Sequence, residues 1–187
     1  TADAAFSALD DAVNRLGPPG ATIFKLGPGW SKSIGDWSPG AGFPGGMKAA
    51  ADGIHARNMK AGITIAPFAV EQGSKTAREH PEWLLSSDEP IRPSTGPALL
   101  RLDTSRPGVQ NMVFNLARRA SREWGFDYVE VDMTGFTTPP KMFLNRDATS
   151  QEALLKFIKL IRAAAGPAAI IGVTNAEPTD TLPGVDI

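Results

Sequence analysis

The chain has 187 residues, of which 42% are hydrophobic and 21% charged, with a formal net charge of −1 at pH 7. This apolar fraction excludes a disordered chain, the 19 glycines and 16 prolines follow no collagen-like period, and no apolar run is long enough to span a membrane. The lack of cysteine excludes disulfides, zinc–thiolate sites and thiol nucleophiles, and the near-neutral charge balance argues against nucleic acid as the main partner.

The length predicts a single domain, residues 1–187. It lies just below the roughly 200 residues of the smallest complete (β/α)8 barrels. The N-terminal sequence Thr1-Ala2-Asp3 has neither an initiator methionine nor a basic and apolar signal region. It is typical of a processed end or of a boundary chosen for expression, and localisation stays open between the cytoplasm and a processed secreted protein.

Helices and short apolar strands are predicted to alternate along the chain. Apolar residues at helical spacing predict helices at 6–16, 47–54, 109–124 and 149–161, the last with a capping-box signature. Apolar runs predict strands at 21–26, 62–66, 98–102, 126–133 and 168–173, with one more starting at 185–187. Long loops follow the strands, at 27–46, 67–97 and 134–148, whereas helix-to-strand connections are short.

This alternation predicts an α/β fold that resembles a (β/α)8 TIM barrel, with about five to six parallel strands and intervening helices. Function in such folds collects at the carboxyl ends of the strands. We therefore expect the long loops that follow the strands to build the active face.

The segment 128–132, Tyr-Val-Glu-Val-Asp, carries the strongest chemical signal. Because side chains alternate along a strand, Tyr128, Glu130 and Asp132 share one face and the two valines share the other, which suits packing against helices. Carboxylates two residues apart lie within roughly 7 Å of each other. The pair favours a nucleophile, a general acid–base pair or a metal site; the structural alternatives are a solvated strand end and an internal ion pair with lysine or arginine.

Further candidate ligand-binding residues follow other strands. Asp103 either orients a ligand or caps the following helix. Trp30 and Trp37, in a glycine-rich loop, either provide stacking platforms for sugar rings or pack the loop. Asp36 either contacts the ligand or forms a turn. Neither histidine has metal-ligand spacing, and no phosphate loop or esterase elbow is present in the sequence, so the leading interpretation includes no metal and no cofactor.

Several stretches have an order and spacing that extend over nearly the whole chain. They are Gly35-Asp36-Trp37, Phe43-Pro44-Gly45-Gly46-Met47-Lys48, Asp52-Gly53-Ile54-His55, Met59-Lys60-Ala61-Gly62-Ile63, Ala66-Pro67-Phe68, Glu79-His80-Pro81-Glu82-Trp83-Leu84-Leu85, Leu102-Asp103, and Trp124-Gly125-Phe126-Asp127-Tyr128-Val129 leading to Asp132. Together they resemble the melibiase-type α-galactosidases, a retaining glycoside hydrolase family on a (β/α)8 barrel.

The resemblance implies that Asp132 is the nucleophile that attacks the anomeric carbon of a carbohydrate substrate, and that Trp30 and Asp103 lie beside the pocket. Retaining chemistry needs a second carboxyl about 5 Å away as the acid/base. The resemblance places that residue beyond a stretch like 182–187, and it implies that the first barrel strand and the last two are missing. A sheet edge left open in this way predicts self-association.

The sequence departs from the family where the sugar would lie. Two adjacent aspartates that usually precede Gly-Trp are Gly27-Pro28 here, a tryptophan usual before the Ala-Pro-Phe motif is Thr64, and the lysine usual two residues before the nucleophile is Glu130. A charge reversal beside a nucleophile lowers its reactivity. We therefore expect weak or absent hydrolysis of aryl α-galactosides.

Two other functions stay open. A non-hydrolytic or engineered barrel would bind a ligand or a hard divalent cation, such as Mg²⁺ or Ca²⁺, through Glu130, Asp132 and Asp103. Alternatively, Glu130 would act as a general base for proton transfer in a mostly apolar pocket. In every case we expect neither nucleic acid nor a membrane as partner.

Overall fold

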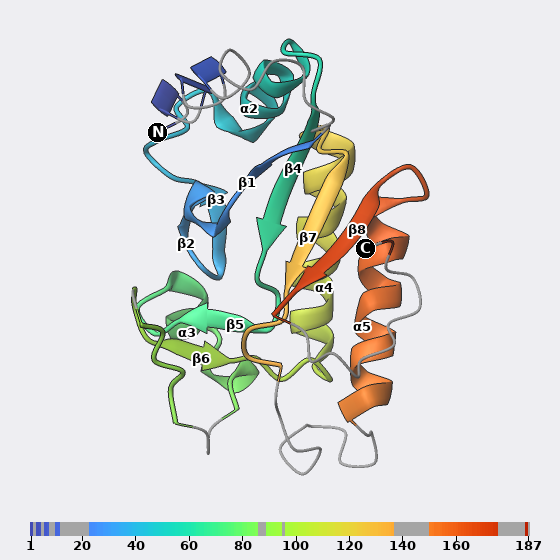
Figure 1. Cartoon of the computed structure of the whole chain (residues 1–187). Coiled ribbons are helices and arrows are strands. Elements are labelled where there is room, and N and C mark those ends of the chain that lie inside the picture. The colour runs from blue at the N-terminus through green and yellow to red at the C-terminus, as the bar shows by residue number, and fades with distance from the viewer. Residues whose placement is uncertain are drawn as a thin grey trace.

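The computed structural model of the chain describes residues 1, 3–4, 6–7, 10–11, 23–85, 89–94, 96–136, 150–175 and 186. Its centre is a four-stranded parallel sheet in the order β1-β4-β7-β8 (Figure 1). The strands are β1 (Ile23–Leu26), β4 (Lys60–Ile65), β7 (Tyr128–Asp132) and β8 (Ile170–Thr174). They follow one another in chain order, as in the wall of a βα barrel, and the predicted α/β class is confirmed.

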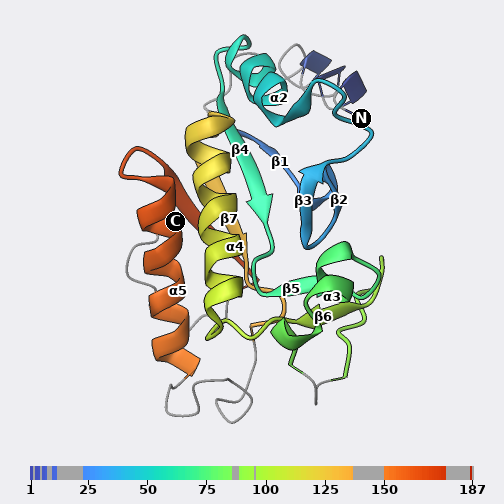
Figure 2. The same ribbon diagram turned by 180° about the vertical axis from the view of Figure 1, so that it is seen from behind.

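Two helices, α4 (Pro107–Arg118) and α5 (Ser150–Ala165), lie side by side over one face of this sheet (Figures 1 and 2). α4 starts with a proline at its first turn, where a missing N–H costs nothing, and it continues as a π-helical turn, Arg119–Glu123. Val129 and Val131 of β7 belong to the same buried cluster as the apolar residues of both helices. The valines therefore face the helices, as the alternating pattern predicts. No described helix is long and apolar enough to cross a membrane.

The loop after β1 folds into a hairpin of β2 (Ser31–Ser33) and β3 (Asp36–Pro39), preceded by the 3-10 turn η1 (Pro28–Trp30). Gly35 turns the hairpin with a φ of +105°, and a Cβ at this position would lie 2.7 Å from Val70. Only glycine meets both conditions. A short helix, α2 (Gly46–His55), then leads into β4.

The loop after β4 contains β5 (Ala69–Glu71), α3 (Lys75–Glu79), the 3-10 turn η2 (Pro81–Trp83) and β6 (Leu99–Arg101). The strand expected at 98–102 does form, but it pairs antiparallel with β5 and lies outside the parallel sheet. It is three residues long and pairs back onto a strand that closely follows β4, so it belongs to a loop rather than to a βα unit. The described parallel sheet therefore has four strands instead of about five to six.

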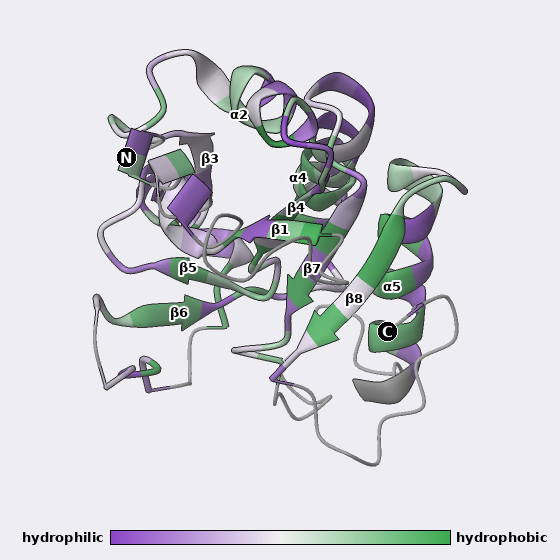
Figure 3. Cartoon of the chain, turned by 45° about the horizontal axis from the view of Figure 1, so that its top comes forward, coloured by the Kyte–Doolittle hydropathy of each residue, from purple (hydrophilic) through white to green (hydrophobic). Residues whose placement is uncertain are grey.

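Of residues 176–187, the structure describes Asp186, which lies beside β8. Its backbone N–H donates to the carbonyl of Ile171 at 2.7 Å, on the side where a next strand would pair. The rest of the strand expected at 185–187, most of the helix expected at 6–16 and the capping residue Thr149 lie outside the described residues. Figure 3 shows apolar residues in β5 and β6 as well as in β7 and β8.

Candidate active site

The parallel register aligns side chains in rows on the sheet face opposite α4 and α5. From the amino to the carboxyl ends of the strands, the rows are Gly62–Tyr128–Ile170, Thr64–Glu130–Gly172 and Asp132–Thr174. The carboxyl ends of parallel strands meet at one edge, which is where ligands bind in such sheets. Asp132 lies in the row nearest this edge, and Glu130 lies one row below it.

Tyr128 forms the base of this arrangement. A Cβ at Gly172 would lie 2.1 Å from the Tyr128 hydroxyl oxygen, and a Cβ at Gly62 would lie 3.1 Å from its Cδ1, so the ring occupies the space over both glycines. The hydroxyl donates a hydrogen bond to Glu130 Oε1 at 3.3 Å. Burial first, and then the negative charge of Glu130, raise the pKa of Tyr128 above its usual value, which keeps the phenol protonated as a donor.

Glu130 is only 8% exposed and is held from three sides. Lys25 Nζ lies 2.6 Å from both of its carboxylate oxygens. The Thr64 hydroxyl donates to Oε2 at 3.0 Å, and the Tyr128 hydroxyl donates to Oε1. Two hydrogen bonds on each oxygen use the acceptor capacity of a carboxylate. Of the interpretations open for this residue, the structure therefore shows the internal ion pair.

Asp132 ends β7 and is partly exposed. Its Oδ1 accepts hydrogen bonds from the backbone N–H of Thr134 at 2.8 Å and from Asn175 Nδ2 at 2.9 Å. Asn175 follows β8 with a φ of +56°, a conformation that asparagine tolerates better than most residues. Within the described part of the chain, Oδ2 accepts no hydrogen bond. One oxygen is thus fixed, and the other is available at the edge of the sheet.

Asp103 is 2% exposed and serves the turn before α4. Its Oδ1 accepts from the backbone N–H of Ser105 at 3.0 Å and from the Ser105 hydroxyl at 2.6 Å, while Oδ2 lies 3.2 Å from Arg106 Nε. Asp103 thus serves the turn before α4 rather than the N-cap of that helix, which is Arg106. The described residues contain no group of three or more acidic or histidine side chains that could hold a metal ion. Glu130, Asp132 and Asp103 therefore do not form the cation site of the alternative interpretation.

Trp30 is 1% exposed, and its indole N–H donates to the Thr64 carbonyl at 2.8 Å. Its ring centroid lies 5.9 Å from that of Trp37 and 5.5 Å from that of Trp124. The indole is therefore packed in the core, and a sugar ring has no exposed face of Trp30 on which to stack. This corrects the stacking interpretation for Trp30 in favour of loop packing, since burying the large aromatic surface stabilises the loop.

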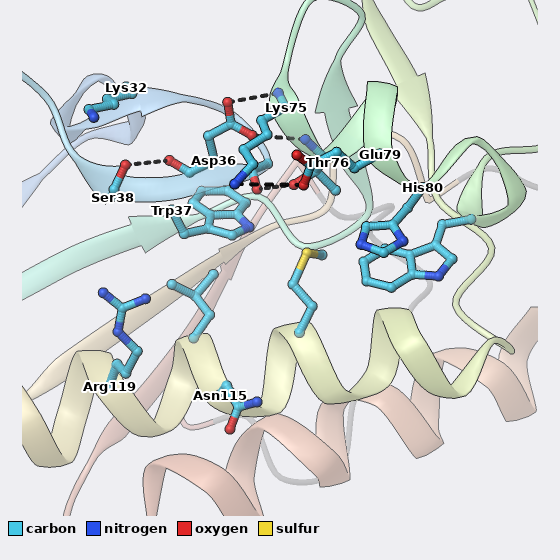
Figure 4. A pocket seen from close by; sticks show the side chains of 14 residues that line it. Lys32, Asp36, Trp37, Ser38, Lys75, Thr76, Glu79, His80, Asn115 and Arg119 are labelled. Atoms are coloured by element: carbon cyan, nitrogen blue, oxygen red, sulfur yellow. Dashed lines mark hydrogen bonds and ion pairs between the residues drawn. The ribbon is translucent and has the colours of Figure 1, made fainter.

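Asp36 and Trp37 lie at a different place, a pocket of about 700 Å³ between the β2–β3 hairpin, α3 and α4. Figure 4 shows these two residues on the wall opposite Asn115 and Arg119 of α4. Asp36 accepts from the backbone N–H groups of Lys75 and Thr76, at 2.8 and 3.0 Å. Burial tends to raise the pKa of Asp36, but these hydrogen bonds outweigh it and the pKa is lowered. Asp36 thus caps the first turn of α3 from the β2–β3 hairpin, which differs from the local turn that the sequence predicts.

The predicted site residues therefore divide into separate places. Glu130 and Asp132 lie together on β7, Asp36 and Trp37 line the pocket beside α4, and Asp103 and Trp30 are buried elsewhere. Sequence reasoning did not single out Lys25. Its signal is a charged residue inside a short apolar strand, which favours a partner of opposite charge on a neighbouring strand.

Comparisons with known proteins agree with the resemblance that the sequence motifs indicate. The melibiase family model matches residues 9–161. The bifunctional alpha-galactosidase/sucrose kinase AgaSK of Mediterraneibacter gnavus is 32% identical over 106 residues, which are 55% of this chain and 11% of that protein. Alpha-galactosidase Mel36A of Lactobacillus acidophilus is 27% identical over 135 residues, 67% of this chain and 18% of that protein.

Among solved structures, the alpha-galactosidase TtGalA of Thermus thermophilus, in complex with stachyose, superimposes with a TM-score of 0.71 at 27% identity. The match covers 89% of this chain and 36% of that one. The chain thus spans about a third of this structural relative and a smaller share of the curated relatives. The resemblance drawn from the sequence motifs is confirmed, and the chain belongs to the melibiase family.

Proposed function

We propose that the protein hydrolyses α-galactosides with retention of configuration, with Asp132 as the nucleophile. The observation that carries the proposal is the Asp132 carboxylate at the carboxyl end of β7, with Oδ1 fixed by Thr134 and Asn175 and Oδ2 oriented without a described partner. A nucleophile held in one orientation loses little entropy on reaching the anomeric carbon. Membership of the family and the stachyose and p-nitrophenyl α-galactoside complexes of TtGalA support this substrate class.

In this mechanism the Asp132 carboxylate attacks the anomeric carbon while the bond to the leaving-group oxygen breaks. The leaving oxygen takes a proton from a general acid, and water then hydrolyses the glycosyl ester with the conjugate base accepting a proton. Glu130 is not assigned the acid/base role, because Lys25, Thr64 and Tyr128 occupy its oxygens. p-Nitrophenyl α-galactoside, whose leaving group needs little protonation, is therefore the substrate that tests Asp132 independently of the acid/base.

The test compares p-nitrophenol release by the wild type and by Asp132→Asn. We expect slow release by the wild type and a further loss of at least about a thousandfold in Asp132→Asn, because the amide is a poor nucleophile. Asp52→Asn is the matched control, since Asp52 lies in an exposed ion pair with Lys48 on α2. A rate in Asp132→Asn equal to that of the wild type would contradict the proposal.

A second variant tests the stereochemistry. Asp132→Gly leaves room for a small anion beside the anomeric carbon, and added azide should restore turnover by attacking from the side of the lost carboxylate. The expected product is β-galactosyl azide, identified by NMR. Formation of the α-azide would exclude Asp132 as a nucleophile of a retaining reaction.

We also propose that the protein self-associates through the edge of its parallel sheet. In the described residues, β1 pairs with β4 on one side only, and an unpaired strand edge is a template for another strand. Analytical ultracentrifugation over a range of concentrations tests this proposal. A monomer at every concentration would refute it.

A further inference from the structure

The half-buried ion pair between Lys25 and Glu130 joins three adjacent strands directly below Asp132. Lys25 is on β1, Thr64 on β4 and Glu130 on β7, and the Lys25 side chain reaches one row toward the carboxyl ends to meet the carboxylate. We infer that Lys25 binds the sugar beside Asp132, and that Glu130 is a positioning residue that makes this site selective for an uncharged sugar. The inference rests on the proposed function and names the group that selects the substrate.

Exposure separates the roles of the two partners. The Lys25 side chain is 39% exposed, whereas that of Glu130 is 10% exposed. All the acceptor positions of Glu130 are used by its three neighbours, so its carboxylate has no lone pair free to accept a hydrogen bond from a ligand. An ammonium group has three N–H donors, and two of them point at the Glu130 oxygens. Among the described residues no other acceptor meets Lys25, so one donor is available to a ligand hydroxyl.

The backbone that follows Lys25 is open on its side-chain side. A Cβ placed on Gly27, the residue that follows β1, would meet no atom within 4 Å. Glu130 and Asp132 are two residues apart on one strand face, a separation of about 7 Å, which one sugar ring spans. A pyranose at the edge of the sheet therefore reaches both the Lys25 ammonium and the free oxygen of Asp132.

The charges then determine which sugar fits. Lys25 and Glu130 cancel, so Asp132 is the only uncompensated charge in the set, and a carboxylated sugar is repelled. The removal of the Glu130 charge would leave the Lys25 ammonium uncompensated and attractive to an anion. Glu130 thus holds Lys25 in place and keeps it from selecting acidic sugars.

The experiment measures the binding of galactose and of galacturonate by calorimetry. Lys25→Met should weaken galactose binding about tenfold or more, because a hydrogen bond from a charged donor is lost. Glu130→Gln should shift the ratio of the two affinities about tenfold toward galacturonate. Lys48→Met, which removes a lysine from the exposed pair with Asp52, should change neither.

Thermal unfolding checks that each variant is folded. If Lys25→Met does not fold, Lys25→Gln replaces it, with the same expectation. Unchanged galactose binding in the Lys25 variants would overturn the inference while leaving the proposed function intact. A loss of stability in Glu130→Gln with an unchanged affinity ratio would likewise overturn it, since this is the behaviour of a structural ion pair. A wild type that binds no galactose and releases no p-nitrophenol would refute the proposed function and the inference together.

Discussion

Replacing Gly172 with alanine should displace the Tyr128 ring that lies beneath Glu130. The added Cβ would lie 2.1 Å from the hydroxyl oxygen of Tyr128, 2.7 Å from Cζ and 2.9 Å from Cε2. On its other side the ring lies over Gly62, where a Cβ would lie 3.1 Å from Cδ1, so the space for a sideways shift is small. The tyrosine must rotate out of its place or the strands must separate.

The cost follows from these contacts. Overpacking costs about 1–3 kcal/mol, and the hydrogen bond from Tyr128 to the charged Glu130 contributes about 1.5 kcal/mol at the low end of its range, since it is long. We expect a loss of about 3 kcal/mol in the free energy of unfolding, or a decrease in Tm of about 6 to 12 °C for a chain of this size. Urea unfolding followed by circular dichroism measures the first quantity, and a thermal scan measures the second.

A double-mutant cycle tests the physical cause. All three atoms within 3 Å of the added methyl lie beyond Cγ of the tyrosine, so Tyr128→Val removes them. In that background Gly172→Ala should cost less than about 1 kcal/mol, because alanine fits a strand at least as well as glycine. Gly73→Ala, where a Cβ would meet nothing within 4 Å, is the matched control. An equal loss in both backgrounds would refute the reasoning.

Two further predictions concern pH. Because the pKa of Asp36 is lowered, its contribution to stability is present above about pH 3.8 and is lost as the pH falls through the folded-state value. Asp36→Ala should cost about 1 kcal/mol in the free energy of unfolding at pH 7, measured with urea, and should flatten the decline in stability at acid pH. An unchanged acid profile in this variant would exclude the capping of α3 by Asp36. The raised pKa of Tyr128 has the opposite sign, so its contribution is complete below about pH 10 and is lost as the pH rises through the folded-state value. Tyr128→Phe should therefore flatten the alkaline decline in Tm, and a wild-type alkaline profile in this variant would show that Tyr128 is not the titrating group.

Some of the site could be predicted because it depends on short-range geometry. Alternation along a strand is enough to place Glu130 and Asp132 on the face away from the valines, and strand direction is enough to place Asp132 at the carboxyl edge. The local roles of the other two aspartates were not predicted correctly: Asp36 was expected to form a turn and caps α3, whereas Asp103 was expected to cap α4 and forms the turn before it. Both residues bond to backbone N–H groups nearby in space, and a short acidic side chain in a loop serves such groups as readily as it serves a ligand.

Other features depend on contacts between distant segments. Lys25 and Glu130 are 105 residues apart, and their pairing required β1, β4 and β7 to be adjacent and in register. Trp30 lies in a glycine-rich loop that looks exposed in sequence, but its indole meets the Thr64 carbonyl and two other tryptophans in the core. The direction of β6 was likewise set by its pairing with β5 and not by its own apolar run.

By itself, the sequence determined the α/β class, the family and the strand that carries Asp132, because hydrophobic period and motif spacing are local properties of the chain. Only the tertiary structure decided which charged groups are paired and which are available to a ligand. Whether a carboxylate is available to a ligand depends on which donors surround it, and for Glu130 those donors come from two other strands and from Tyr128. The carboxylate of Asp132, two positions later, is partly exposed, and in the described part of the chain one of its oxygens is bonded and the other is available, because β7 ends there and its neighbours are loop residues.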